Sequence, residues 1–191
     1  MKEKVLNTFR ALGHDMTAHA NGRSLYQHCE RVATLLSSWK EPDFMSNAAF
    51  FHSIYGREGT SFSPVPTERR QDIASVIGKQ AEELAYLNCA MTTASFWRNF
   101  HLRQKFLSQN VSPTLFDRFQ SKQVSVSWEI LIALFRLNFA NMIDHIDFDR
   151  PIDEFKWHDL SLYLQYGEFL SPVELALFFQ TFKIEDRPNE Y

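Results

Sequence analysis

The stretch SWEILIALFRLNFANMIDHI, residues 127–146, decides the fold, because it predicts one long helix that is apolar on nearly every side. A helix with a single apolar stripe covers one side of a core, whereas a helix that is apolar all round is enclosed by other elements. We therefore expect this helix to be central. Asn141 interrupts its apolar surface, and a buried amide without a partner costs on the order of 1–3 kcal/mol. Asn141 is therefore a candidate for the wall of a pocket.

Helical periodicity continues on both sides of this segment, and strand signals are weak. We therefore predict an all-α fold, a helical bundle that forms one domain over residues 1–191. The stretch 57–68 is loop-like, because it is rich in Ser, Thr, Gly and Pro. The other predicted helices span residues 2–12, 24–40, 42–56, 71–78, 79–97, 112–120, 156–170 and 171–182. Ser24 is the predicted N-cap of the second of these helices.

Composition argues against two classes of partner. A formal charge of -3 and an isoelectric point near 6.2 lack the basic excess that phosphate backbones require, so no nucleic acid is expected. No apolar run approaches the roughly 18 residues needed to cross a bilayer, and the start lacks the apolar core of a signal peptide. We predict a cytoplasmic location and no membrane. Cys29 and Cys89 fit no zinc spacing and are expected as reduced core thiols.

Four segments, in chain order, carry a resemblance to a known family. They are HANGRSLYQHCERVATLL (19–36), AAFFHSIYGREGT (48–60), RRQDIASVIGKQAEELAYLNCAM (69–91) and LFRLNFANMIDHI (134–146). Together they resemble the HD superfamily of metal-dependent phosphohydrolases, especially the hydrolase domain of the bifunctional alarmone (ppGpp) enzymes. The same segments also resemble a group of stand-alone domains that carry His-Ser-Ile-Tyr-Gly at the position of the His-Asp dyad. The resemblance implies an HD-like helical bundle over residues 17–146, with residues 147–191 as a C-terminal helical extension.

The resemblance also implies where a metal would bind. It places the two histidine ligands of the family at His28 and His52, whereas Ser53 and Asn141 stand where the family has aspartates. A unit charge pair at about 4 Å and an effective dielectric constant near 20 is worth roughly 4 kcal/mol. Because about 1.4 kcal/mol changes affinity tenfold, losing two carboxylates weakens an inherited metal site by orders of magnitude.

Nearby carboxylates could repair this loss. Glu58 follows His52 by six residues, past the Gly56 break, and Asp144 and His145 lie one helical turn beyond Asn141, so at least one of the two could share its face. The metal ligands would then be His28, His52, Glu58 and one of that pair, for which we take Asp144. Such a set resembles the histidine and carboxylate sites that hold divalent Mn, Fe or Zn. Without such repair, no cofactor is expected.

Within the resemblance, the candidate residues have two roles. The catalytic candidates are His52, Ser53 and Glu58, and the substrate-binding candidates are Arg23, Tyr55 and Asn141. Arg23 matches a basic residue that contacts nucleotide in the alarmone hydrolases, but it is equally explained as a solvated arginine. Tyr55 is equally explained as an ordinary packing aromatic.

Four functions remain open. They are an HD-like hydrolase of a phosphorylated or small polar metabolite, a non-haem iron oxygenase on the same fold, an inactive module that binds a nucleotide or small molecule, and a structural domain with a filled core. The oligomeric state is not indicated. The family kinship and its site require that three distant segments bring His28, His52 and Asn141 together.

Overall fold

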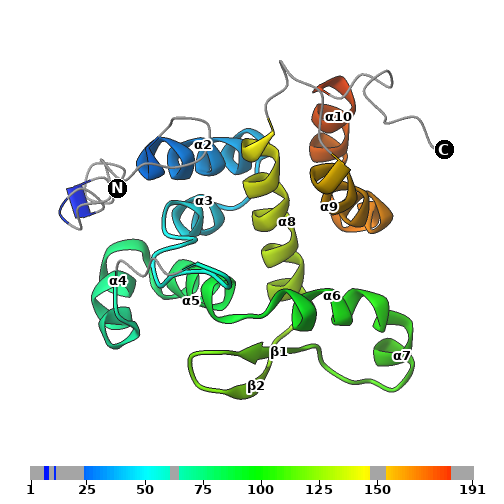
Figure 1. Cartoon of the computed structure of the whole chain (residues 1–191), viewed down its shortest axis with the longest axis horizontal. Coiled ribbons are helices and arrows are strands. Elements are labelled where there is room, and N and C mark those ends of the chain that lie inside the picture. Colours follow the sequence, from blue (N-terminus) through cyan, green and yellow to red (C-terminus); the bar gives the residue numbers. More distant parts are fainter. Residues whose placement is uncertain (1–6, 9–10, 12–23, 61–64, 147–153, 182–191) are drawn as a thin grey trace.

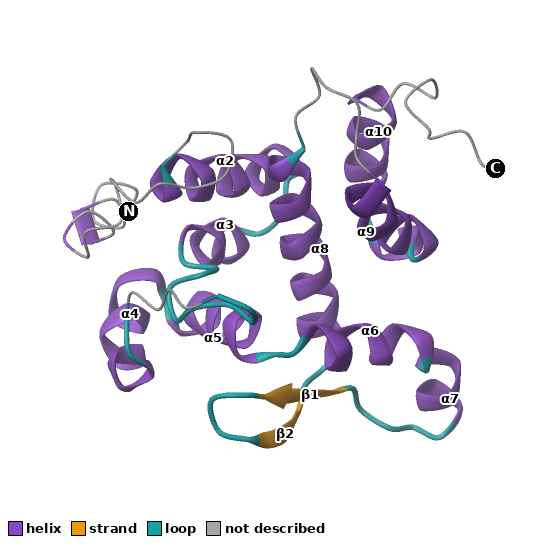
Figure 2. Ribbon diagram, in the orientation of Figure 1, coloured by secondary structure: helices purple, strands orange, loops and turns teal. Residues whose placement is uncertain are grey.

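The computed structural model describes residues 7, 8, 11, 24–60, 65–146 and 154–181. Within these residues the chain is mostly helical, with one small antiparallel sheet of two strands (Figure 2). A largely all-α fold is therefore confirmed, whereas the predicted helix 2–12 and Arg23 lie almost wholly outside the described residues. The elements are α2 (Leu25–Ser38), α3 (Asp43–Phe50), η2 (Thr67–Arg69), α4 (Arg70–Ile77), α5 (Lys79–Ala90), α6 (Thr93–His101), α7 (Arg103–Ser108), β1 (Thr114–Asp117), β2 (Lys122–Ser125), α8 (Trp128–His145), α9 (Glu154–Gln165), η3 (Gly167–Phe169) and α10 (Pro172–Thr181).

Helix α8 is the central helix that the sequence predicts. It stands between α2, α3 and α5 on one side and α9 and α10 on the other (Figure 1). All five residues of the run 137–141 are buried, and their side chains point in successive directions around the helix. Every side of this part of α8 is therefore covered. None of the described helices is long and apolar enough to cross a membrane.

Helix α2 begins at the predicted N-cap, Ser24. Ser24 Oγ accepts the N–H of Gln27 at 3.2 Å, and Gln27 Oε1 accepts the N–H of Ser24 at 3.0 Å. This reciprocal capping box satisfies two N–H groups that a helix start otherwise leaves without partners. The cap fixes the start of the helix, and His28 and Cys29 lie on its buried face.

The helix predicted over residues 42–56 is wrong at its end. Helix α3 stops at Phe50, and the chain continues through tight turns in which, for example, the N–H of Ile54 donates to Phe51 O at 3.0 Å. The apolar run that follows α3 suits a helix and a series of turns equally, because both can bury it. His52 consequently lies in a turn and not on a helix.

The segment 112–120, predicted to be helical, forms the start of a β-hairpin instead. Strand β1 pairs antiparallel with β2. Asp117 initiates the turn between them, because its Oδ1 accepts the N–H groups of Phe119 at 2.9 Å and Gln120 at 3.0 Å. Such local side-chain to backbone bonds compete with helix formation.

Two further predicted helices are interrupted. The segment 79–97 divides after Ala90, and Thr92 caps α6 by accepting the N–H of Ser95 at 3.3 Å. The segment 156–170 divides after Gln165, where α9 ends and the short η3 begins. The first interruption redirects the chain from α5 toward α6 (Figure 1).

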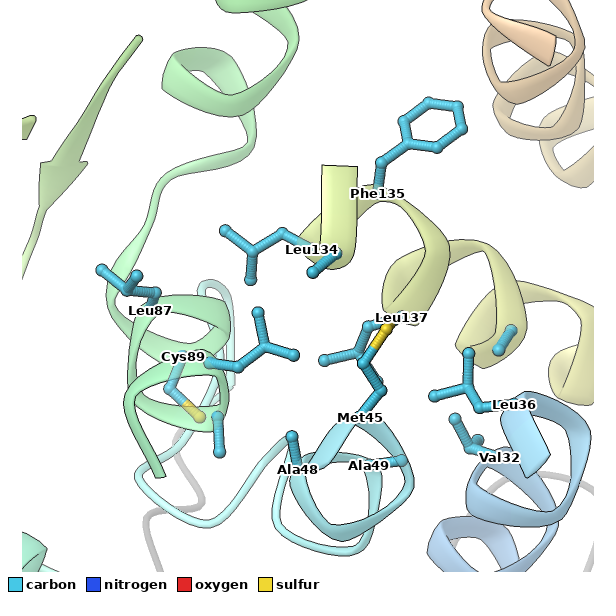
Figure 3. Close-up of a cluster of buried hydrophobic side chains, with 14 of the residues drawn as sticks. Val32, Leu36, Met45, Ala48, Ala49, Leu87, Cys89, Leu134, Phe135 and Leu137 are labelled. Carbon is cyan, nitrogen blue, oxygen red and sulfur yellow. The ribbon is translucent and has the colours of Figure 1, made fainter. Parts of the chain in front are cut away.

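The two sides of α8 contact different kinds of side chain. Toward α2, α3 and α5 the contacts are aliphatic, with Leu137 facing Met45 and Leu36, and Leu134 facing Leu87 (Figure 3). Toward α6 and α9 they are aromatic. The Phe135 ring lies 5.0 Å from Phe100 and 5.1 Å from Tyr163, and Trp97 lies 5.0 Å from Tyr163, between ring centroids. Such pairs add about 0.5–1.5 kcal/mol each beyond burial, and they join α6 and α9 to α8.

Helix α10 is anchored through Glu174, which is fully buried. Glu174 Oε2 accepts the N–H of Ser171 and lies 3.7 Å from Arg136 Nε, while Oε1 has no hydrogen-bond partner within the described residues. Arg136 also donates to Glu41 Oε1 at 2.9 Å. Burial raises the pKa of Glu174, although its bonds to Ser171 and the Arg136 charge oppose this effect.

We predict that Glu174 makes stability depend on pH. A carboxyl group whose folded pKa is raised above the unfolded value of 4.5 contributes its full stability below pH 4.5 and loses it as pH rises through the folded pKa. Glu174→Gln keeps the cap without the charge. Urea unfolding across this range should show the wild type losing stability relative to the variant as pH rises. If the difference in free energy of unfolding between wild type and Glu174→Gln does not change with pH, the prediction is contradicted.

We also predict that shortening a buried side chain of α8 lowers the stability of the fold. Leu134 is fully buried, so Leu134→Ala should lower the free energy of unfolding by about 2–5 kcal/mol, measured by urea denaturation. The matched control is Leu107→Ala, because Leu107 is 49% exposed and its truncation should change stability by less than about 0.5 kcal/mol. Equal effects of the two substitutions would refute the assignment of α8 as the enclosed helix.

Candidate functional site

The structure brings three of the predicted site residues together in one place. His28 of α2 places its Nε2 3.2 Å from Nε2 of His52, in the turn after α3, and 3.0 Å from Oδ1 of Asn141 on α8. The three residues are 1%, 2% and 8% exposed, respectively. Three segments that are far apart in the sequence therefore meet in a buried polar group, which we call the histidine cluster.

Asp144 sets the orientation of His28. Its Oδ2 lies 2.9 Å from His28 Nδ1, and its Oδ1 accepts from Arg31 Nε. Burial would raise the pKa of Asp144, but the hydrogen bonds from His28 and Arg31 outweigh burial and hold the pKa below its ordinary value. Because a carboxylate only accepts hydrogen bonds, His28 Nδ1 carries a proton, and Nε2 is the nitrogen that faces the cluster.

His52 is oriented in the same way by the backbone. Its Nδ1 lies 2.7 Å from Ala49 O, a carbonyl that can only accept, so Nδ1 donates. Burial lowers the pKa of His52 well below its usual value, and the neighbouring His28 and Arg57 lower it further. The imidazole is therefore neutral, and its Nε2 presents a lone pair to His28.

Because both Nδ1 atoms carry protons, the Nε2 atoms of two neutral imidazoles would face each other at 3.2 Å with lone pairs only. This contact therefore requires a positive charge between the two Nε2 atoms. One solution is a proton on His28 Nε2, shared with His52 Nε2 and Asn141 Oδ1. The other is a metal cation bound by these three atoms. The residues fit the second solution, because metal-binding histidines usually donate their other N–H to a carboxylate or a backbone carbonyl. The separation also fits, since two nitrogens about 2.0–2.1 Å from one tetrahedral ion lie roughly 3.3 Å apart.

The four metal ligands predicted from the sequence do not form one set. Glu58 is exposed, and its Oε2 accepts the N–H of Thr93 at 2.7 Å. Asp144 contacts His28 Nδ1 and Arg31, on the side of the imidazole away from the cluster. Among the residues that the structure describes, no three or more His, Cys, Asp or Glu side chains are placed to hold a metal ion. A metal in the cluster would therefore need the Asn141 oxygen.

Two further predicted residues lie beside the cluster and not in it. Ser53 is half-buried next to the Cys29 thiol, whose pKa it lowers against the larger effect of burial. Tyr55 is fully buried and donates its hydroxyl proton to Glu82 at 2.8 Å. This environment agrees with the alternative explanation of Tyr55 as an aromatic residue that packs in the core.

A chain of hydrogen bonds holds the His52 turn against α5 and α8. Asn88 Nδ2 donates to His52 O at 2.7 Å, and Asn138 Nδ2 donates to Asn88 Oδ1 at 2.8 Å. Arg57 Nη2 in turn donates to Asn138 Oδ1 at 2.8 Å. Sequence reasoning missed Arg57, Asn88 and Asn138. The available signal was Asn138, a second amide one turn before Asn141 on an apolar helix.

A cavity of about 450 Å³ lies next to the histidine cluster. Sites for small molecules typically measure about 300–1,000 Å³, so this cavity is large enough for one. The polar residues that line it include Arg57, Thr93, Asn138, Asn141, His145, Lys156 and Asp159. Asn141 belongs to both features, because its Oδ1 faces His28 and the residue also lines the cavity.

Comparison with known proteins locates part of this site. Residues 8–93 match the model of a family described as a domain of unknown function (DUF6817), which spans less than half of the chain. The matched part includes His28 and His52 but ends before Asn141. No curated protein and no solved structure matches the chain.

We predict that both cysteines next to His52 are unreactive in the folded protein. Cys29 Sγ lies 3.9 Å from His52 Nδ1, and Cys89 Sγ donates to His52 O at 3.2 Å. Burial raises the pKa of Cys29, and it raises the pKa of Cys89 to about 12. Ellman's reagent at pH near 8 should therefore detect no thiol before denaturation and both cysteines of the chain afterwards. Rapid reaction of either native thiol would contradict the buried placement.

Proposed function

We propose that the chain is an HD-like domain that binds a small phosphorylated or polar metabolite beside a divalent cation. Nε2 of His28, Nε2 of His52 and Oδ1 of Asn141 would hold the cation. The observation that carries the proposal is the pair of Nε2 atoms 3.2 Å apart, with both Nδ1 atoms donating elsewhere. The proposal includes the HD kinship, the helical bundle that it implies and a cytoplasmic location.

The chain itself supplies three elements of such a site. Asp144 and Ala49 O orient the two imidazoles, and Asn141 offers a neutral oxygen where the resemblance would place a carboxylate. Neutral donors leave the charge of a divalent ion largely uncompensated, which weakens its binding but strengthens its attraction for an anion in the adjoining cavity. When bound, the ion would polarise a phosphoryl oxygen and lower the pKa of a bound water.

Hydrolysis of the same metabolite is the second candidate. The facing Nε2 atoms favour it, because two histidines that share an ion are common to many hydrolytic sites. Binding without turnover ranks first because Glu58, a predicted catalytic residue, contacts Thr93 instead of the cluster. Iron in place of Mn or Zn would favour the alternative of an oxygenase.

We predict that the native protein binds about one Mn, Fe or Zn ion per chain, measured by elemental analysis of untagged protein after loading and desalting. His52→Ala should lose the ion and remain folded, because the backbone O of residue 52 still accepts from Asn88 and Cys89. His101→Ala is the matched control, since His101 is an exposed histidine on α6. Folded wild type without metal, or equal metal in His52→Ala, would leave the proton as the bridging charge and refute the cation site.

Turnover distinguishes the two candidate functions. Metal-loaded wild type and His52→Ala are compared for release of phosphate from 4-nitrophenyl phosphate and of phosphate or pyrophosphate from ppGpp. Release that the substitution abolishes would establish hydrolysis. Stabilisation of the protein by either compound without release, seen as a higher melting temperature, would establish a binding module. Absence of metal, stabilisation and turnover would refute both candidates in favour of a structural domain.

A further inference from the structure

Charged side chains line the cavity. Among the described residues of its lining, Arg57 and Lys156 are cationic and Asp159, whose pKa is raised by burial, is the carboxylate. Arg57 is held in place by its bond to Asn138, which is itself bound to Asn88. A guanidinium presents its N–H donors in a planar fork that matches the oxygens of a carboxylate or phosphate. The loss of side-chain entropy on binding an oxyanion is smaller for an arginine that is already positioned.

The cavity is also lined by apolar side chains. They are Met91, Phe96, Trp97, Met142 and the ring of Tyr163. The Trp97 and Tyr163 rings meet edge to face, with 5.0 Å between centroids and 72° between planes. Aromatic and thioether side chains form a surface that suits a ring or a short hydrocarbon body.

Tyr163 lines the same cavity as Arg57. It is 8% exposed, and its hydroxyl has no hydrogen-bond partner among the residues that the structure describes. Burial raises the pKa of Tyr163, so the hydroxyl keeps its proton and can donate it in a hydrogen bond. A ligand in the cavity could therefore meet both residues.

We propose that the cavity binds a small amphipathic anion. Its carboxylate or phosphate group lies against Arg57 and Lys156, and its ring or hydrocarbon body lies against Trp97, Met142 and Tyr163. This inference rests on the proposed function in taking the cavity as the ligand site, and it deepens that function by naming the ligand class.

Part of the cavity lining lies outside the family match. Lys156, Asp159 and Tyr163 belong to α9, beyond residues 8–93 and beyond the segments that resemble HD hydrolases, whereas Arg57 lies within both. Selectivity for the body of the ligand would depend on residues of α6, α8 and α9. The histidine cluster would contribute through Asn141, which lines the same cavity.

The test is isothermal titration calorimetry of the full chain at low ionic strength with four probes. They are 4-nitrophenyl phosphate, 4-nitrobenzoate, the neutral 4-nitrobenzyl alcohol and inorganic phosphate. The two aryl anions should bind at least about tenfold more tightly than the alcohol, because the alcohol offers Arg57 no charged acceptor. They should also bind at least about tenfold more tightly than inorganic phosphate, because inorganic phosphate has no body to contact the apolar side chains. Equal binding of the alcohol would overturn the anionic anchor, and equal binding of inorganic phosphate would overturn the apolar contact. Binding of none of the probes would overturn the proposal entirely.

Substitutions of the two cationic residues test whether the aryl anions bind in this cavity. Arg57→Gln and Lys156→Gln should each weaken both aryl anions about tenfold and leave the alcohol unchanged. Arg98→Gln is the matched control, because Arg98 is an exposed arginine on α6 that does not line the cavity. Arg57 also bonds Asn138, so its variant is checked by thermal unfolding, and Lys156→Gln tests the site if that variant does not fold. Unchanged affinity in folded variants would overturn the assignment.

Metal analysis of the same preparations separates this inference from the proposed function. If the wild type holds a cation that depends on His52 but discriminates none of the probes, the ligand class is wrong and the cation site stands. If the aryl anions bind through Arg57 and Lys156 in protein without metal, the ligand class stands and the cation site is wrong.

Discussion

Asp144 accepts a hydrogen bond from His28 Nδ1 across the core, and the arrangement of the site depends on this contact. An ionised carboxylate 2% exposed on an enclosed helix is costly unless charged or polar partners satisfy it. His28 and Arg31 of α2 provide these partners, so the bond both fixes α2 against α8 and turns His28 Nε2 inward. Loss of either partner would leave a buried charge without full compensation.

The same constraint applies along α8, where polar residues recur at each turn of an otherwise apolar helix. Asn138 bonds Asn88 and Arg57, Asn141 bonds His28, and Asp144 bonds His28 and Arg31. A fully satisfied buried network specifies one arrangement of its neighbours, because any shift leaves a polar group unpaired. The polar residues of α8 thereby position both the histidine cluster and one wall of the cavity.

Sequence patterns predicted the parts of this arrangement that depend on a single helix. The apolar circumference of residues 127–146 indicated that α8 is enclosed, and Ser24 indicated the start of α2. The patterns failed where short-range bonds decide the structure, as at Asp117, whose carboxylate forms a turn in a predicted helix. They also failed for Arg57, because a loop residue acquires its role only when the fold brings Asn138 within reach.

Electrostatics couples the two parts of the site. The positive charge of Arg57 contributes to the low pKa of His52, so Arg57 acts at the imidazole that would hold a cation. The field that disfavours a proton on His52 also disfavours a metal ion beside it. An anion bound at Arg57 would offset this repulsion, and a cation in the cluster would strengthen anion binding by the same factor, since coupling between two ligands is reciprocal. A site with neutral metal donors and a cationic cavity is therefore suited to bind cation and anion together, and each weakly alone.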